Sequence, residues 1–193
     1  MKPQYLIGYF LTAVLVVWSL VSQNYEFMIY AAAVLVLVVL LHSTQKIYHF
    51  KSGVLWAFVA WIIMHILGGL LPVGNGVLYS KVLIPIIGEP YEILKYDQVV
   101  HAYCYTVVAL LLWPVVMHVA KPENGHKTLV FLTVLAATGI GGLNEIVEFI
   151  ATLTVPETNV GGYENTAIDI VANLLGALLA IPFLKRPNKA DPM

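Results

Sequence analysis

Long apolar runs, separated by short polar or glycine- and proline-containing stretches, dominate this chain. Six runs reach about 20 mostly apolar residues, some only with their flanks, which is the length that a helix needs to cross a bilayer. The second run is short, so we expect it either to tilt less or to extend into its flanks. The pattern predicts an all-α fold, a polytopic transmembrane bundle forming one integral membrane domain (1–193), with about six spanning helices at roughly Tyr5–Ser22, Glu26–Leu41, Val54–Leu71, Asp97–Ala120, Lys127–Thr154 and Thr166–Leu184.

The composition agrees with a membrane protein. The chain has 193 residues, of which 60% are hydrophobic and 11% are charged, whereas soluble domains carry about 25% charged residues. The mean hydropathy is +0.83. A net charge of -1 indicates no nucleic-acid partner. The only cysteine, Cys104, excludes an internal disulfide and a cysteine-based zinc site.

The Lys and Arg residues predict the orientation of the helices, because loops on the cytoplasmic side carry an excess of these residues. With the N-terminus inside, eight basic residues are cytoplasmic and two, Lys81 and Lys95, are outside. We therefore expect a multi-pass protein of the inner cell membrane with both termini in the cytoplasm. The eight residues counted inside are Lys2, Lys46, Lys51, Lys121, Lys127, Lys185, Arg186 and Lys189.

Six ionisable residues interrupt the apolar runs or stand at their ends. An ionisable group inside a bilayer costs at least about 2.5–3.5 kcal/mol, so such groups are candidates for a functional site. The predicted orientation places all six near the outer ends of their helices, with His65 about 9 Å before the end of its helix at a rise of 1.5 Å per residue. They are His65, Asp97, His101, Glu145, Glu148 and Asp169.

The spacing of these residues brings pairs of them onto single helix faces. Asp97 with His101, Glu145 with Glu148, and Asp169 with Asn173 are three or four residues apart, and such neighbours share a face. Each pair can therefore point into the bundle, where polar groups inside a membrane belong. Thr166 or Asn165 suits the cap of the last helix better than Asp169, which leaves Asp169 free to face the bundle.

Carboxylates and imidazoles are typical ligands of transition metals, so a metal site is the first interpretation, with Zn or Mn as the expected ion. The candidate ligands are His65, His101, Glu145 and Glu148. Asp97 or Asp169 would act as the general base, because a base must reach the proton that it removes. Asn144, Asn173 and Tyr105 are expected to orient these groups through hydrogen bonds.

Two other interpretations remain open. The cluster could be a hydrogen-bonded network that holds the helices together. It could also be part of a path for protons or a small solute. A path would need polar residues in the inner half of the bundle, and segments such as Val107–Trp113 and Leu129–Leu135 are almost purely apolar. The other histidines, His42, His49, His118 and His126, are predicted to be solvated or to face lipid headgroups on the inner side.

The outer loop from Pro72 to Tyr96 is long for a compact bundle, and long loops are often functional. Its apolar stretch, Val82–Ile87, is too short to span a membrane. The alternatives are a partly buried surface loop, a segment in the membrane interface, or a lid over the polar cluster.

Three motifs resemble those of VanZ-like membrane proteins. Tyr96-Asp97-Gln98-Val99-Val100-His101, followed by Tyr105, is similar to their D-x-x-x-H…Y helix. Asn144-Glu145-Ile146-Val147-Glu148 is similar to their E-x-x-Q helix, and Asp169-Ile170-Val171-Ala172-Asn173, followed by Gly176-Ala177, to their D-x-x-x-N-x-x-G-A helix. The chain also resembles the related YjdF-type inner membrane proteins, in the second glutamate, Glu148, and in His65-x-x-Gly68-Gly69 on an earlier helix. The resemblance implies that the polar cluster matters, and it names no substrate.

These observations lead to one functional hypothesis. We expect a metal site at the level of the outer leaflet that binds or acts on an amphipathic small molecule of the cell envelope, a lipid or a lipid-linked compound, with membrane lipids as its surroundings. The alternatives are a small transporter or proton-coupled path, and a structural partner protein. No Gly-x-Ser-x-Gly, P-loop or dinucleotide fingerprint is present, so the sequence does not support the chemistries of those motifs.

Overall fold

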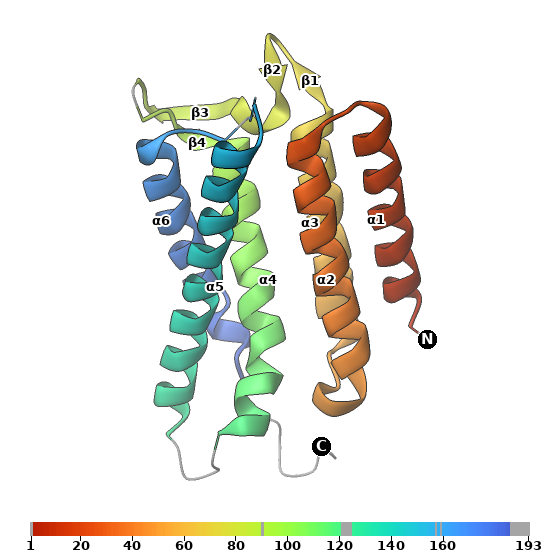
Figure 1. Cartoon of the computed structure of the whole chain (residues 1–193). Coiled ribbons are helices and arrows are strands. Elements are labelled where there is room, and N and C mark those ends of the chain that lie inside the picture. The colour runs from red at the N-terminus through yellow and green to blue at the C-terminus, as the bar shows by residue number, and fades with distance from the viewer. Residues whose placement is uncertain (1, 90, 121–124, 157, 159, 186–193) are drawn as a thin grey trace.

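The computed structural model describes residues 2–89, 91–120, 125–156, 158 and 160–185. Six helices in this part of the chain are long and apolar enough to cross a membrane, and they stand side by side as a bundle (Figure 1). The all-α polytopic fold is therefore confirmed. The helices are α1 (Pro3–Val21), α2 (Tyr25–Tyr48), α3 (Ser52–Leu70), α4 (Tyr96–Val119), α5 (His126–Thr154) and α6 (Tyr163–Leu179), with a final 3₁₀ turn, η2 (Ile181–Phe183).

Two helices differ from the predicted boundaries. The second helix has 24 residues because the Asn24 side chain caps its start, accepting a hydrogen bond from Phe27 N, and because it continues to a left-handed residue, His49. His42 therefore lies inside α2, where it stacks on Tyr5 and bonds Tyr9 at 3.0 Å. His42 was expected in an inner loop, solvated or facing lipid headgroups; it is instead a half-buried residue of α2, because apolar periodicity does not reveal this packing between helices.

The last helix begins at Tyr163, with Gly162 as its N-cap. Asn165 and Thr166 are thus inside the first turn, and the prediction that one of them caps the helix was wrong. The periodic apolar pattern starts only after them, which explains the late predicted boundary.

The bundle consists of two packed halves. Helix α1 packs on α2 and α3, and α4 packs on α5 and α6, while α3 and α4 form the main contact between the halves. Hydrogen bonds from Tyr96 Oη to Met64 O and from Tyr103 Oη to Ala57 O cross that contact. Apolar cores fill both halves, one around Phe58 and Ile62, the other around Trp113 and Leu129.

The long loop folds into two small antiparallel hairpins at one end of the bundle, which we call the strand end (Figure 1). Strand β1 (Pro72–Val73) pairs with β2 (Gly76–Val77) through a turn in which Gly74 has a φ of +60°, a conformation that favours glycine. A 3₁₀ turn, η1 (Leu78–Ser80), follows and packs on α3 and α4. Strand β3 (Val82–Ile87) then pairs with β4 (Ile93–Lys95).

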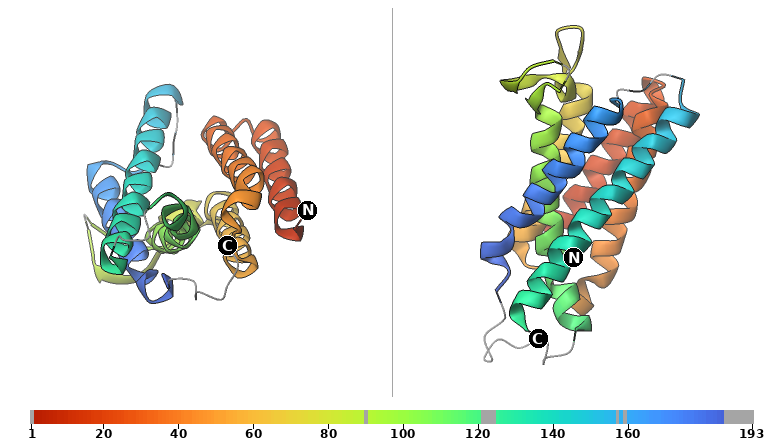
Figure 2. Two further views of the ribbon diagram at one scale, coloured as in Figure 1. Left: turned by 90° about the horizontal axis from the view of Figure 1, so that it is seen from below. Right: turned by 90° about the vertical axis from the view of Figure 1, so that its left-hand side faces the viewer.

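The helices α1, α3 and α5 begin at the opposite end of the bundle, which is also where η2 lies (Figure 2). Lys2, Lys46, Lys51, Lys127 and Lys185 belong to that end, whereas Lys81 and Lys95 lie at the strand end. Three residues of the predicted inner charge, Lys121, Arg186 and Lys189, lie outside the described residues.

Candidate functional site

His101 is the centre of the polar cluster. It lies in the second turn of α4, and its side chain is almost fully buried. Its Nδ1 atom is 2.9 Å from Oδ1 of Asn173 on α6, so that an Nδ1–H donates to the amide oxygen. The Nε2 atom then offers its lone pair on the other side of the ring, as in imidazoles that bind metals.

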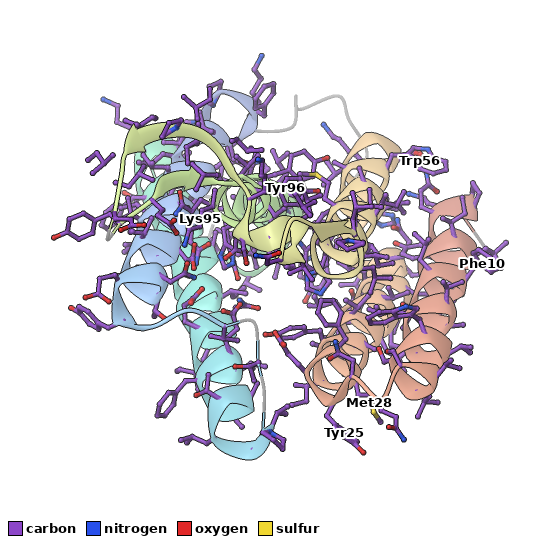
Figure 3. All side chains as sticks on the ribbon, turned by 90° about the horizontal axis from the view of Figure 1, so that it is seen from above. Phe10, Tyr25, Met28, Trp56, Lys95 and Tyr96 are labelled. Atoms are coloured by element: carbon purple, nitrogen blue, oxygen red, sulfur yellow. The ribbon has the colours of Figure 1, made fainter. Side chains whose placement is uncertain are left out.

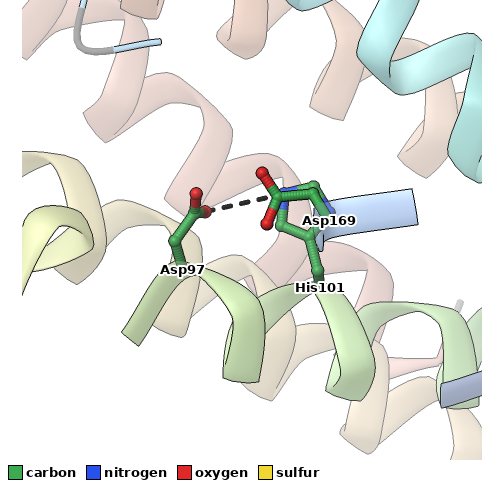
Figure 4. Close-up of side chains that lie close together, drawn as sticks. All are labelled: Asp97, His101 and Asp169. Atoms are coloured by element: carbon green, nitrogen blue, oxygen red, sulfur yellow. Dashed lines mark ion pairs between the residues drawn. The ribbon is translucent and has the colours of Figure 1, made fainter. Parts of the chain in front are cut away.

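Four carboxylates surround this imidazole. Asp97, one turn earlier on α4, places Oδ1 at 3.5 Å from His101 Nε2 (Figure 4). Two more come from α5: Oε1 of Glu148 is 3.9 Å from Nε2, and Oε1 of Glu145 is 3.5 Å from Nδ1. Asp169 on α6 is the fourth and is fully buried.

These groups form two overlapping sets that could hold a metal ion. Asp97, His101 and Asp169 each offer a ligand atom within 4.8 Å of the others, and so do His101, Glu145 and Glu148. His101 belongs to both sets, so the two sets are parts of one site. We call these five residues the carboxylate–imidazole cluster.

Several oxygen atoms of the cluster accept no hydrogen bond from the described residues. By distance and angle this holds for both carboxylate oxygens of Glu145 and for Oδ1 of Asp169, all of them buried, although the amides of Asn144 and Asn173 lie close to Glu145. Only single donors reach the others: Asn144 Nδ2 donates to Glu148 Oε1 at 2.7 Å, and Asn165 Nδ2 donates to Asp169 Oδ2. Buried carboxylates normally have hydrogen-bonded or charged partners, so this donor-poor cluster fits a cation.

Close helix packing brings the cluster together. A Cβ atom at Gly176 would collide with the backbone carbonyl of Ala102, so only glycine lets α6 lie this close to α4. Thr106 Oγ1 bridges the same contact by donating to Gly176 O at 2.8 Å. A Cβ at Gly141 on α5 would come within 2.6 Å of the Asn173 amide, which shows how closely α5 approaches.

Three residues of the cluster, Asp97, His101 and Glu148, form part of one wall of a pocket between the two halves of the bundle. Its volume is about 70 Å³, enough for several water molecules at about 10–15 Å³ each. Asp97, His101, Glu148 and Tyr105 line it from the α4–α5 side, and the Tyr105 ring lies 6.3 Å from the His101 ring. None of the residues that line it is Lys or Arg.

The opposite wall is aromatic. The rings of Phe27, Tyr30, Trp61 and Tyr79 all lie within 6 Å of His65, measured between ring centroids. His65 Nδ1 and Tyr79 Oη form a hydrogen bond. Burial, together with the nearby carboxylates Asp97 and Glu148, raises the pKa of Tyr79 well above its usual value, so the hydroxyl stays protonated.

The structure thus brings eight of the nine predicted site residues into direct association. Asp97, His101, Glu145, Glu148 and Asp169 form the cluster, while Asn144, Asn173 and Tyr105 contact it. His65 lines the same pocket but belongs to neither candidate ligand set in the described part of the chain.

Among the residues that line the pocket and that sequence reasoning did not assign to the site are Glu26, Tyr30, Tyr79 and Asn165. Glu26 was predicted as the first residue of the second helix; it is buried in the first turn of α2, where Tyr30 Oη donates to its Oε1 at 3.2 Å. The i, i+4 spacing of Asn165 and Asp169 was a signal of the same kind as the three pairs already identified. No pattern in the loop indicated Tyr79, because its position depends on the folding of η1.

A comparison with known families assigns the chain to a class of membrane proteins. Residues 4–189 match the family described as "Predicted membrane protein (DUF2238)". The match covers nearly the whole chain, so this protein belongs to that family. The comparisons with curated proteins and with solved structures give no match.

Proposed function

We propose that the carboxylate–imidazole cluster holds a divalent transition metal, Zn or Mn, and that this membrane protein uses the site to bind or act on an amphipathic molecule. The observation that carries the proposal is the charge balance of the cluster. Four carboxylates face one imidazole, no Lys or Arg lines the pocket, and Lys95, whose charge acts on Asp169, is paired with Glu92 at 2.9 Å. Even a protonated His101 would leave three negative charges in excess, and buried charges require compensation.

The residues present fit such an ion. His101 offers Nε2 while Asn173 holds the other ring nitrogen, and the carboxylates of Glu145 and Asp169 have oxygens without hydrogen-bond donors among the described residues. Imidazole favours Zn, and carboxylate favours Mn. The ion would supply a positive charge that polarises an oxygen of the bound molecule. Asp97, whose side chain keeps 21% of its surface exposed, is the carboxylate best placed to accept a proton there.

The proposed setting is the outer leaflet of the inner membrane, with both termini in the cytoplasm. The Lys residues of the described chain support this orientation, since five stand at the end opposite the strands and two at the strand end. Glu148 lies six residues before the end of α5, about 9 Å below it. That depth is where the polar part of a lipid or lipid-linked molecule meets its hydrocarbon chain, which supports an amphipathic ligand.

A small transporter or proton path is the weaker alternative. The two apolar cores occupy the bundle from the cluster toward the other end. We also propose that this family is close to the VanZ-like and YjdF-type proteins. The motifs around Asp97, Glu145 and Asp169, in the same order along the chain, support that kinship.

Metal analysis of the purified protein tests the proposal. We expect a stoichiometric transition metal in protein from metal-replete cells, and its loss in the Glu145→Ala/Glu148→Ala double variant, which should still fold. His126→Ala, at the opposite end, is the matched control and should keep the metal. Protein that contains no metal and takes up none on titration with Zn²⁺ or Mn²⁺ would contradict the proposal.

A further inference from the structure

The pocket lies behind a seam between α2 and α5. In the described part of the chain these two helices share no extended packing contact, while α3 and α4 hold the halves together on the other side. The view along the bundle shows that α2 and α5 lie nearer each other at the strand end than at the opposite end (Figure 2). Glu26 and Tyr30 line the pocket from α2, and Asn144 and Glu148 line it from α5.

The mouth of this seam is apolar. A shallow hollow at the strand end lies between Tyr25, Met28 and Ile29 of α2 and the segment Thr154–Pro156 after α5. The Met28 and Tyr25 side chains point away from the bundle there (Figure 3), with 37% and 56% of their surface exposed. In a membrane-spanning protein such a face contacts the hydrocarbon chains of the lipids, because apolar side chains exposed in the bilayer core do not contact water.

The strand-end loop does not cover this side. Its 3₁₀ turn and strands contact α3 and α4, and seen from above they lie over the part of the bundle away from Tyr25 and Met28 (Figure 3). Tyr79 belongs to this roof and fixes it to His65. The roof therefore covers the pocket at the strand end on the side of α3 and α4.

We propose that the ligand enters the pocket sideways from the leaflet at the strand end, through the seam between α2 and α5, and that its hydrocarbon chain remains in the seam. The inference rests on the proposed function and specifies its ligand as a chain-bearing lipid. A pocket of about 70 Å³ holds only the tip of a polar headgroup, so the rest of the molecule must stay outside it. The polar pocket and the apolar hollow are lined by neighbouring residues of α2, Tyr30 and Ile29, and this adjacency supports a single hydrocarbon chain as the occupant.

Cys104 provides the test, because it is the only cysteine and it lines the pocket. The protein in lipid nanodiscs, which expose both faces, would be treated with two maleimides, one on a twelve-carbon alkyl chain and one sulfonated and confined to water. We expect the alkyl reagent to label Cys104 faster. Ile29→Trp should obstruct the mouth and slow the alkyl reagent by about tenfold, a barrier increase of about 1.4 kcal/mol, without slowing the sulfonated one.

Leu35→Trp is the matched control, since it is exposed on the same helix but turned by about 120° from Ile29; it should change neither rate. Faster labelling by the sulfonated reagent, no labelling by either, or equal effects of the two tryptophans would overturn lateral entry. Metal content of the same samples separates the two proposals. Metal without seam-dependent labelling refutes only the entry route, and seam-dependent labelling without metal refutes only the metal site.

Discussion

Asn173 offers the sharpest separation between a metal site and a purely structural network. Its amide oxygen holds His101 Nδ1 at 2.9 Å, and its Nδ2 atom has no hydrogen-bond partner among the described residues. Asn173→Ala removes the group that orients the imidazole and also removes a buried, unsatisfied donor. We expect metal affinity to fall, together with a loss of stability of about 1–3 kcal/mol, because the buried His101 Nδ1–H loses its acceptor.

The expected size follows from the contact that is lost. Groups that orient a metal ligand through a hydrogen bond typically contribute a factor of about 10–100 in affinity, or about 1.4–2.8 kcal/mol of binding free energy. Calorimetric titration of the metal-stripped protein with Mn²⁺ would measure the dissociation constant, and thermal unfolding in the same detergent would measure stability.

Thr133→Ala is the matched control. Thr133 is also fully buried, but its hydroxyl donates to Leu129 O within α5, twelve residues and thus about 18 Å from Glu145. It should lower the melting temperature and leave Mn²⁺ affinity unchanged. If Asn173→Ala bound Mn²⁺ as tightly as the wild type, His101 would not be oriented as argued, and unchanged affinity together with a fall in stability would favour a structural network.

Three further predictions concern the membrane, the packing and the roof. Reporter fusions at Gly76 and Asn188 should report opposite sides of the membrane, and a shared side would overturn the orientation. Gly176→Ala should lower the melting temperature, since overpacking against backbone costs about 1–3 kcal/mol, whereas Gly142→Ala, with open space around it, should be neutral or gain up to about 1 kcal/mol. Because the pKa of Tyr79 is raised, the phenolate absorbance of Tyr79→Phe should match that of the wild type up to about pH 10; loss of a titration near that pH would refute its burial.

The helices and most of the cluster were predictable from the sequence because both depend on local spacing. Apolar length defines a span, and i, i+3 or i, i+4 spacing defines a face, so the spacing alone assigns His101 and Glu145 to inward faces. Depth followed from counting residues along each helix. These inferences need no knowledge of which helices are neighbours.

The remaining parts of the site depend on long-range packing, which spacing does not encode. His65 matches the cluster in depth, but the structure turns it toward Tyr79 and the aromatic wall. From the sequence alone, Glu26 is a charged residue at the start of a helix. Only the packing of α2 beside the pocket shows that Glu26 lines it. The close approach of α6 to α4 depends on Gly176 meeting the Ala102 carbonyl, and glycine in a membrane helix is too common to identify such a contact.

The two main interpretations of the cluster make different demands on its hydrogen bonds. A neutral network that only holds helices together would need a proton on most of the four carboxyl groups, and each added O–H would need an acceptor. Neither carboxylate oxygen of Glu145 makes a well-formed hydrogen bond with the described residues, although the amides of Asn144 and Asn173 lie near it and His101 Nδ1 is 3.5 Å away. Protonating Glu145 would therefore exchange one unsatisfied group for another, at about 1–3 kcal/mol. A cation satisfies these oxygens together, because it needs converging lone pairs and no hydrogen-bond donors. The side chains of α4, α5 and α6 present such lone pairs.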